Sequence, residues 1–79
     1  MSITDETLRE ESDGPRGVRL IRTVFRGEIG FAGEYVVMWW GGPPAGLGYG
    51  EETRRTKTMA RLLYRRKCIE VFGHPPERW

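Results

Sequence analysis

Seven basic side chains lie close together in one short stretch of this chain, and they are its strongest chemical signal. They fall within fourteen residues that include no acid: Arg54, Arg55, Lys57, Arg61, Arg65, Arg66 and Lys67. Such a cluster attracts the phosphate backbone of nucleic acids. It also attracts acidic protein or ribonucleoprotein surfaces, because arginine forms bidentate contacts with carboxylates as well as phosphates. A solvated helix face in an arginine-rich protein has the same composition, so three interpretations stay open.

Groups suited to catalysis are few. His74 is the single histidine and lies in a predicted loop, where a solvated side chain is expected. Cys68 is the single cysteine, and we expect it to pack as a small apolar residue rather than act as a nucleophile. Glu51 and Glu52 are adjacent, so on a helix their carboxylates would point about 100° apart and would not form a catalytic pair. The sequence therefore predicts no enzyme, no metal site and no cofactor.

The glycine-rich segment 41–50 has some features of a phosphate-binding loop. It contains five glycines and two prolines and precedes a predicted helix. However, that helix would begin with Glu51 and Glu52, which repel phosphate, and no Lys-Ser or Lys-Thr pair follows the glycines. We expect a connecting or contact loop.

Residues 35–40, YVVMWW, are the clearest strand, because they are β-branched and aromatic and lie between glycines. Alternation along a strand places Tyr35, Val37 and Trp39 on one face and Val36, Met38 and Trp40 on the other. Both faces are apolar, which is typical of a strand in a sheet covered on both sides. A single helix covers one side only.

The second apolar face of residues 35–40 therefore needs another cover. The options are the loop that carries Leu47 and Tyr49, the C-terminal Trp79, a second copy of the chain in a homodimer, or a different protein. In the last two cases Tyr35, Trp39 and Trp40 would contribute to an interface, where tryptophan, tyrosine and arginine are common energetic anchors.

The predicted elements around these residues form an α+β fold. A basic amphipathic helix is expected over residues 51–67, with Met59, Leu62 and Leu63 facing inward. Residues 18–26 fit a strand better than a helix because they are rich in β-branched residues. Residues 68–72 are interpreted as a final strand, with continuation of the helix to Gly73 as the alternative. The expected order is strand-strand-helix-strand, with a small antiparallel sheet of two or three strands packed on one helix.

Length and charge complete the outline. A chain of 79 residues with 38% hydrophobic residues and a net charge of +2 supports one domain with a thin core. Residues 1–15 are acidic and poor in large apolar side chains, so we expect them to be disordered, and we expect a single domain over 16–79. No apolar run is long enough to span a membrane and no signal peptide is recognised, which predicts a cytoplasmic protein.

The chain resembles the small anti-CRISPR proteins of phages and prophages. The resemblance covers its size, its α+β plan, its acidic start, its arginine-rich composition without Asn or Gln, and segments such as EYVVMWW and ETRRTKTMARLLYRRK. These proteins share no common fold or site, so no functional residue is carried over. Several of them are strongly acidic DNA mimics, and a net charge of +2 departs from that type. The resemblance implies binding to a CRISPR surveillance complex or nuclease in the cytoplasm of a bacterial host.

The functional prediction is a non-enzymatic interaction protein, a phage-type inhibitor that binds a bacterial nucleic-acid-handling complex and blocks its action on DNA. Its expected binding residues are Arg54, Arg55, Lys57, Arg61, Arg65, Arg66, Tyr35, Trp39 and Trp40. The alternatives are a small DNA- or RNA-binding accessory protein that uses helix 51–67 directly, and a prophage or plasmid protein with a purely structural role.

Overall fold

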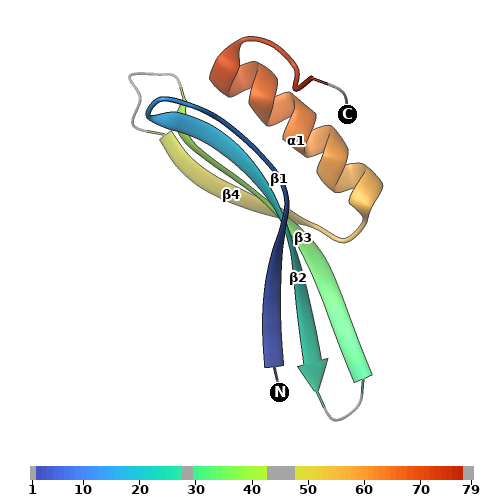
Figure 1. Cartoon of the computed structure of the whole chain (residues 1–79). Coiled ribbons are helices and arrows are strands. Elements are labelled where there is room, and N and C mark those ends of the chain that lie inside the picture. The colour runs from blue at the N-terminus through green and yellow to red at the C-terminus, as the bar shows by residue number, and fades with distance from the viewer. Residues whose placement is uncertain (1, 28–29, 43–47, 78–79) are drawn as a thin grey trace.

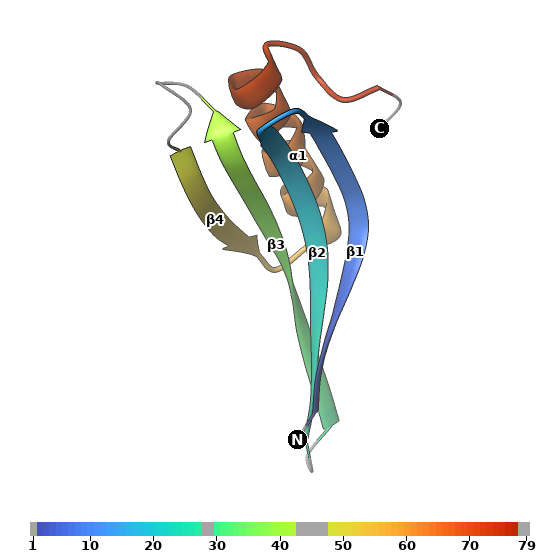
Figure 2. The same cartoon turned by 60° about the vertical axis from the view of Figure 1, so that its left-hand side comes forward.

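The computed structural model describes residues 2–27, 30–42 and 48–77, which form four strands followed by one helix. The elements are β1 (Ser2–Asp13), β2 (Arg16–Gly27), β3 (Gly30–Gly42), β4 (Gly48–Arg54) and α1 (Lys57–Phe72). The strands form one antiparallel sheet in the order β1-β2-β3-β4, and α1 packs on one of its faces (Figures 1 and 2). The α+β class is confirmed. The predicted strand number and the order strand-strand-helix-strand are wrong, because the helix follows all four strands.

The acidic N-terminal segment is strand β1, which corrects the expected disorder of residues 1–15 and extends the folded unit to Ser2. Its carboxylates stand opposite the arginines of β2. Glu10 forms an ion pair with Arg19, and Asp13 lies 3.0 Å from Arg16. Opposite charges across a strand pair are stabilising, so this edge strand is held without a large apolar face.

The turn between β1 and β2 comes from Gly14 and Pro15, which were expected to end a disordered segment. Asp13 and Arg16 close the hairpin as a pair, and Gly14 has a φ of 60°. A glycine with positive φ at the first central position is the requirement of a type II′ turn, whose twist matches the flanking strands. Residues 13–16 therefore form a hairpin turn between β1 and β2.

Strands β2 and β3 contain the two segments predicted as strands, residues 18–26 and 35–40, and confirm both. Their register places Val18 opposite Trp39 and Leu20 opposite Val37. Val18, Leu20 and Val37 are buried beneath α1. The prediction of a loop over residues 41–50 is wrong at both ends, because 41–42 belong to β3 and 48–50 to β4; residues 43–47 lie outside the described residues.

The helix begins later than predicted, because residues 51–54 continue strand β4 opposite β3. Thr56 is the N-cap residue, and its side-chain oxygen accepts a hydrogen bond from the backbone N–H of Met59 at 3.3 Å. An N-cap hydroxyl accepts a hydrogen bond from one of the first-turn N–H groups that have no partner within the helix. Glu51 and Glu52, interpreted as helix-start residues, are strand residues with exposed side chains.

The helix also ends later than predicted, and residues 68–72 are its last turns rather than a strand. Gly73 ends it with a φ of 86°, and its N–H donates to the carbonyl of Ile69 at 2.9 Å. This is the glycine C-cap that the alternative interpretation required. Cys68 and Val71 turn inward into the core, whereas Ile69 is exposed.

The core lies between α1 and the centre of the sheet. Its helix side consists of Ala60, Leu63, Tyr64, Cys68 and Val71. The predicted inward stripe is correct for Leu63 but wrong for Met59 and Leu62, which face solvent. The molecule measures 45 × 24 × 15 Å, and the ends of β1, β2 and β3 reach well past the helix (Figure 1).

Candidate interaction surfaces

The outer side of α1 combines exposed apolar and basic side chains. Met59, Leu62 and Ile69 are 52%, 58% and 44% exposed, although they are large and apolar. On the helix, Leu62 and Ile69 lie opposite the buried residues, and Met59 lies at the side of this surface. Arginines alternate with them along the same side. We call this set the helix surface: Met59, Arg61, Leu62, Arg65, Arg66 and Ile69.

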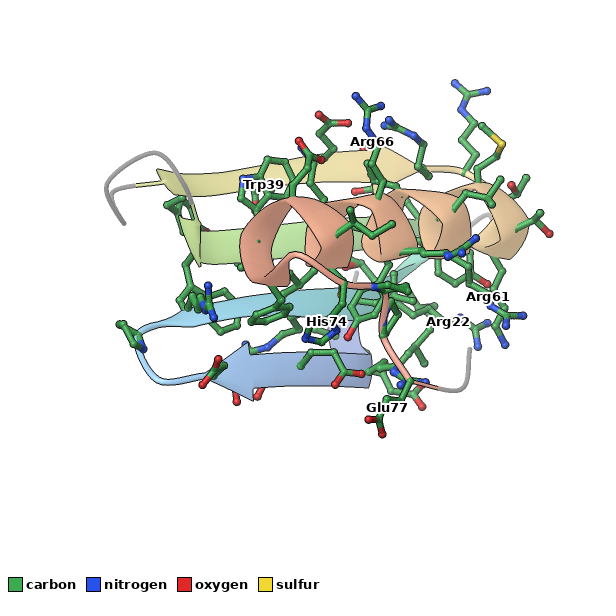
Figure 3. The ribbon with its side chains drawn as sticks, turned by 90° about the horizontal axis from the view of Figure 1, so that it is seen from above. Arg22, Trp39, Arg61, Arg66, His74 and Glu77 are labelled. Carbon is green, nitrogen blue, oxygen red and sulfur yellow. The ribbon has the colours of Figure 1, made fainter. Side chains whose placement is uncertain are left out.

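The predicted basic residues divide between this surface and other places. Arg61 and Arg66 extend from opposite sides of α1 (Figure 3). Helical geometry places Leu62 and Ile69 between them. Arg66 lies 3.7 Å from Glu70, one helical turn away. Arg65 is exposed, and among the described residues it forms no ion pair.

The remaining basic side chains lie around the start of α1 or beneath it. Arg55 and Lys57 are exposed on either side of the N-cap. Arg54 belongs to β4 and pairs with Glu52 at 2.8 Å, so it is not on the helix as predicted. Lys67 is mostly covered, and its Nζ lies 4.1 Å from the centre of the Trp39 ring. The cluster seen in the sequence is therefore only partly one surface.

The three aromatic residues predicted to form an interface do not share a face. Tyr35 and Trp39 lie on the side of the sheet that α1 covers and pack against the core. Trp40 lies on the opposite side, with the Arg19 guanidinium 5.7 Å from its ring centre. All three are half-buried. Trp40 alone is in a position to contribute to a surface away from the helix.

The face of the sheet opposite α1 carries a stripe of half-buried or exposed apolar side chains. We call it the open sheet face: Ile21, Val36, Met38, Trp40 and Tyr49. Tyr49 is 64% exposed. In Figure 2 this face is turned toward the viewer, with α1 behind the sheet. The prediction that one helix leaves the second face of residues 35–40 uncovered agrees with this arrangement over the described residues. Leu47 and Trp79, two of the suggested covers, lie outside them.

Acidic side chains surround the open sheet face. Strand register places Asp5 and Glu10 of β1, Glu34 of β3 and Glu51 of β4 on this side. Arg19 is the one basic residue among the described positions of this side, and it is paired with Glu10. The open sheet face therefore carries a negative balance, while the helix surface is positive.

An open pocket of about 570 Å³ lies between β1 and the segment after α1. Its lining consists of Arg9, Glu11, Phe72, His74, Pro76 and Glu77. Arg9 donates to Glu11 at 2.7 Å and to the carbonyl of Glu77, so its guanidinium ties the C-terminal segment to the sheet. His74 and Glu77 lie over this side of the sheet (Figure 3), and the His74 ring stacks on Phe72.

Cys68 lies on the inner side of α1, where it is buried next to Tyr64. Burial raises the pKa of the Cys68 thiol to about 11 and the pKa of Tyr64 well above its ordinary range. A thiol that stays protonated at neutral pH is a weak nucleophile. Across the described residues, no three His, Cys, Asp or Glu side chains come together as a metal site would require.

Sequence reasoning missed the apolar half of the helix surface. The predicted inward stripe includes Met59 and Leu62, and the predicted helix end at residue 67 places Ile69 in a strand. The phase was readable from Ala60, Tyr64 and Cys68, which recur every four residues and are all buried.

No protein-family model, no curated protein and no solved structure gives a significant match to this chain. Within the described ranges, no helix combines the length and apolar composition needed to cross a lipid bilayer.

Proposed function

We propose that this chain is a non-enzymatic interaction protein that binds an acidic protein surface through the helix surface. The observation that carries the proposal is the alternation of Arg61, Arg65 and Arg66 with exposed apolar side chains on the outer side of α1. Exposed apolar groups next to arginines are typical of protein interfaces, whose buried centres are apolar and enriched in methionine and arginine. An amphipathic helix lying in a groove is a common form of such recognition.

The apolar side chains favour a protein over nucleic acid as the ligand. Phosphate contacts come from Arg, Lys and small polar side chains, and an aliphatic side chain gains nothing from a phosphate. Leu62 is central in the helix surface and 58% exposed. Glu10, Glu34 and Glu51 make the other face of the sheet unfavourable to nucleic acid. The two faces together fit a protein ligand better.

The partner class that we propose is a bacterial nucleic-acid-handling complex, with the chain as a phage-type inhibitor of the anti-CRISPR kind. Support comes from the sequence resemblance and from the basic helix surface, which is complementary to an acidic site on such a complex. Occupation of that site would keep DNA from being engaged or processed.

Direct binding of nucleic acid is the second candidate function. It is favoured by Arg55 and Lys57, which are exposed beside the N-terminus of α1. A helix N-terminus carries a partial positive charge and attracts phosphate. In that case the start of the helix, rather than the centre of the helix surface, would hold the ligand.

A pull-down from bacterial lysate separates these functions. The lysate is divided, one half is treated with nuclease, and the tagged chain is compared with Leu62→Glu and with Thr4→Glu. Both variants add one negative charge, but Thr4 is exposed on β1, away from α1. We expect a protein complex that survives nuclease treatment, is lost with Leu62→Glu and is retained with Thr4→Glu.

Recovery of nucleic acid alone, lost on nuclease treatment, would support the second function and contradict the first. A protein complex retained equally by Leu62→Glu would show that the helix surface is not the binding site. For the inhibitor assignment, the recovered complex is assayed for its action on DNA with and without the chain. An unchanged rate would contradict inhibition.

A further inference from the structure

The two exposed surfaces of this molecule are complementary to each other, which goes beyond the proposed function. The helix surface is apolar and positive, and the open sheet face is apolar and negative. They lie on opposite sides of the molecule (Figures 1 and 2), so they cannot meet within one chain. We infer that the open sheet face is a docking site for the helix surface of a second copy, so that copies associate head to tail.

Charge decides between this arrangement and a symmetric one. Stacking two open sheet faces would bring Glu34 and Glu51 of one copy near the same acidic set of the other. Packing two helix surfaces would bring arginines together. In the head-to-tail arrangement, Arg61, Arg65 and Arg66 meet the acidic border of the sheet, and like-charge contacts are avoided.

The apolar parts of the two surfaces also have similar lengths. On β3, the stripe from Val36 to Trp40 spans about 13 Å at the rise of a strand. On α1, the distance from Met59 to Ile69 is about 15 Å at the rise of a helix. Leu62 would lie over the stripe, about 4.5 Å along α1 from Met59. The sheet would then have a helix on each face, as expected for strands with two apolar sides.

The molecule exposes more surface than a compact monomer of its mass, in keeping with its elongated shape. The accessible surface is 5716 Å². A compact monomer of 9.1 kDa is expected to expose about 4,900 Å², so the excess is about 800 Å². An interface of standard size buries about 800 Å² on each partner. In a head-to-tail chain, an interior copy would bury about that area at each of its two surfaces.

Head-to-tail contacts have a distinctive consequence. The contact is heterologous, so a chain of copies has a free helix surface at one end and a free open sheet face at the other. The helix surface at one end stays available for the partner proposed above, whereas an interior copy has its helix surface covered. Self-association and partner binding would compete for the same arginines.

Sedimentation equilibrium of the purified full chain tests this inference. Two variants each block one surface: Met38→Lys places a cation where the arginines would approach, and Leu62→Glu places an anion where the acidic border would approach. Thr4→Lys is the control for Met38→Lys and Thr4→Glu for Leu62→Glu, and circular dichroism establishes that each variant is folded. We expect the measured mass of the wild type and of both controls to exceed the 9.1 kDa of one chain and to rise with concentration.

The mixture of the two blocked variants is the decisive sample. Each variant alone should be monomeric, and an equimolar mixture should associate, because one supplies an intact sheet face and the other an intact helix surface. A monomeric wild type would overturn the inference. Association of either blocked variant alone at the wild-type level would also overturn it, since symmetric stacking uses only one of the two surfaces. The pull-down above uses a different readout, so either proposal can fail without the other.

Discussion

At the scale of single residues, the two tryptophans of β3 each cover a glycine on a neighbouring strand. A Cβ added at Gly17 would lie 2.2 Å from the Trp40 ring, and one added at Gly50 would lie 2.4 Å from the Trp39 ring. Both pairs are in direct register across the sheet. Glycine lets each indole lie against the backbone, so the rings fill space that a side chain would otherwise take.

We expect Gly17→Ala to reduce the free energy of unfolding by about 1–3 kcal/mol, because the Trp40 ring must move to make room for the methyl group. Urea denaturation measures this change. In a Trp40→Ala background the same substitution should cost clearly less, since the clash is gone. An equal cost in both backgrounds would mean that the ring does not rest on Gly17.

The buried thiol and phenol make stability sensitive to alkaline pH. Burial raises the pKa of Cys68 from about 9 to about 11, and it raises the pKa of Tyr64 as well. The unfolded chain therefore releases these protons first, and the free energy of unfolding should fall as pH rises above about 9. The contribution of Cys68 should level off above about pH 11.

Denaturation curves at about pH 8 and about pH 10.5 measure this effect. Cys68→Ala and Tyr64→Phe each remove one titrating group, so each should show a smaller alkaline loss than the wild type. An alkaline loss that neither substitution reduces would place its origin elsewhere.

At the scale of secondary structure, the ends of α1 are determined by local signals. Thr56 caps the first turn and Gly73 closes the last, with a φ of 86°. We expect Thr56→Ala to cost about 1 kcal/mol of stability, because the first turn loses its hydroxyl acceptor. Thr58→Ala is the matched control on the exposed side of the helix, and its effect should stay within about 0.5 kcal/mol. Equal losses from both would argue against a specific cap.

Strand β1 combines charge pairs with β2 and one apolar contact, since Leu8 packs against the core. Glu10 and Arg19 form an ion pair across β1 and β2, with both side chains about 40% exposed. We expect Glu10→Arg to destabilise the fold by about 0.5–1 kcal/mol, because two arginines then face each other. The exchanged pair, Glu10→Arg with Arg19→Glu, should recover most of the loss in a thermal melt. No recovery would indicate that other contacts hold β1.

Strands β2 and β3 could be predicted because their β-branched and aromatic residues lie between glycines. Such a local pattern is enough to indicate a strand. Strand β1 was not, because its low apolar content resembles a disordered tail, and the strand that it pairs with, β2, is recognised only from the register in the structure. The end of α1 was missed for a similar reason. Cys68 and Val71 have a clear inner side only when the sheet that they pack against is known.

At the scale of the whole molecule, one helix and one sheet form two layers, so each has one side without a layer against it. The apolar outer side of the sheet was expected; the apolar outer side of α1 and the opposite charges of the two sides were not. The basic half of the helix surface could be predicted from Arg61, Arg65 and Arg66 alone. The apolar half could not, because Leu62 looks like a core residue in the sequence and is exposed in the structure.

The most direct test of the central claim, that the outer side of α1 is a docking surface for protein, is site-specific photo-crosslinking. A crosslinking amino acid replaces Leu62 in one sample and Thr4 in another, and both are irradiated in nuclease-treated bacterial lysate. We expect protein adducts from position 62, to a second copy or to a partner, that disappear when Arg65→Glu is added. Adducts from position 62 no more abundant than those from position 4 would contradict the claim.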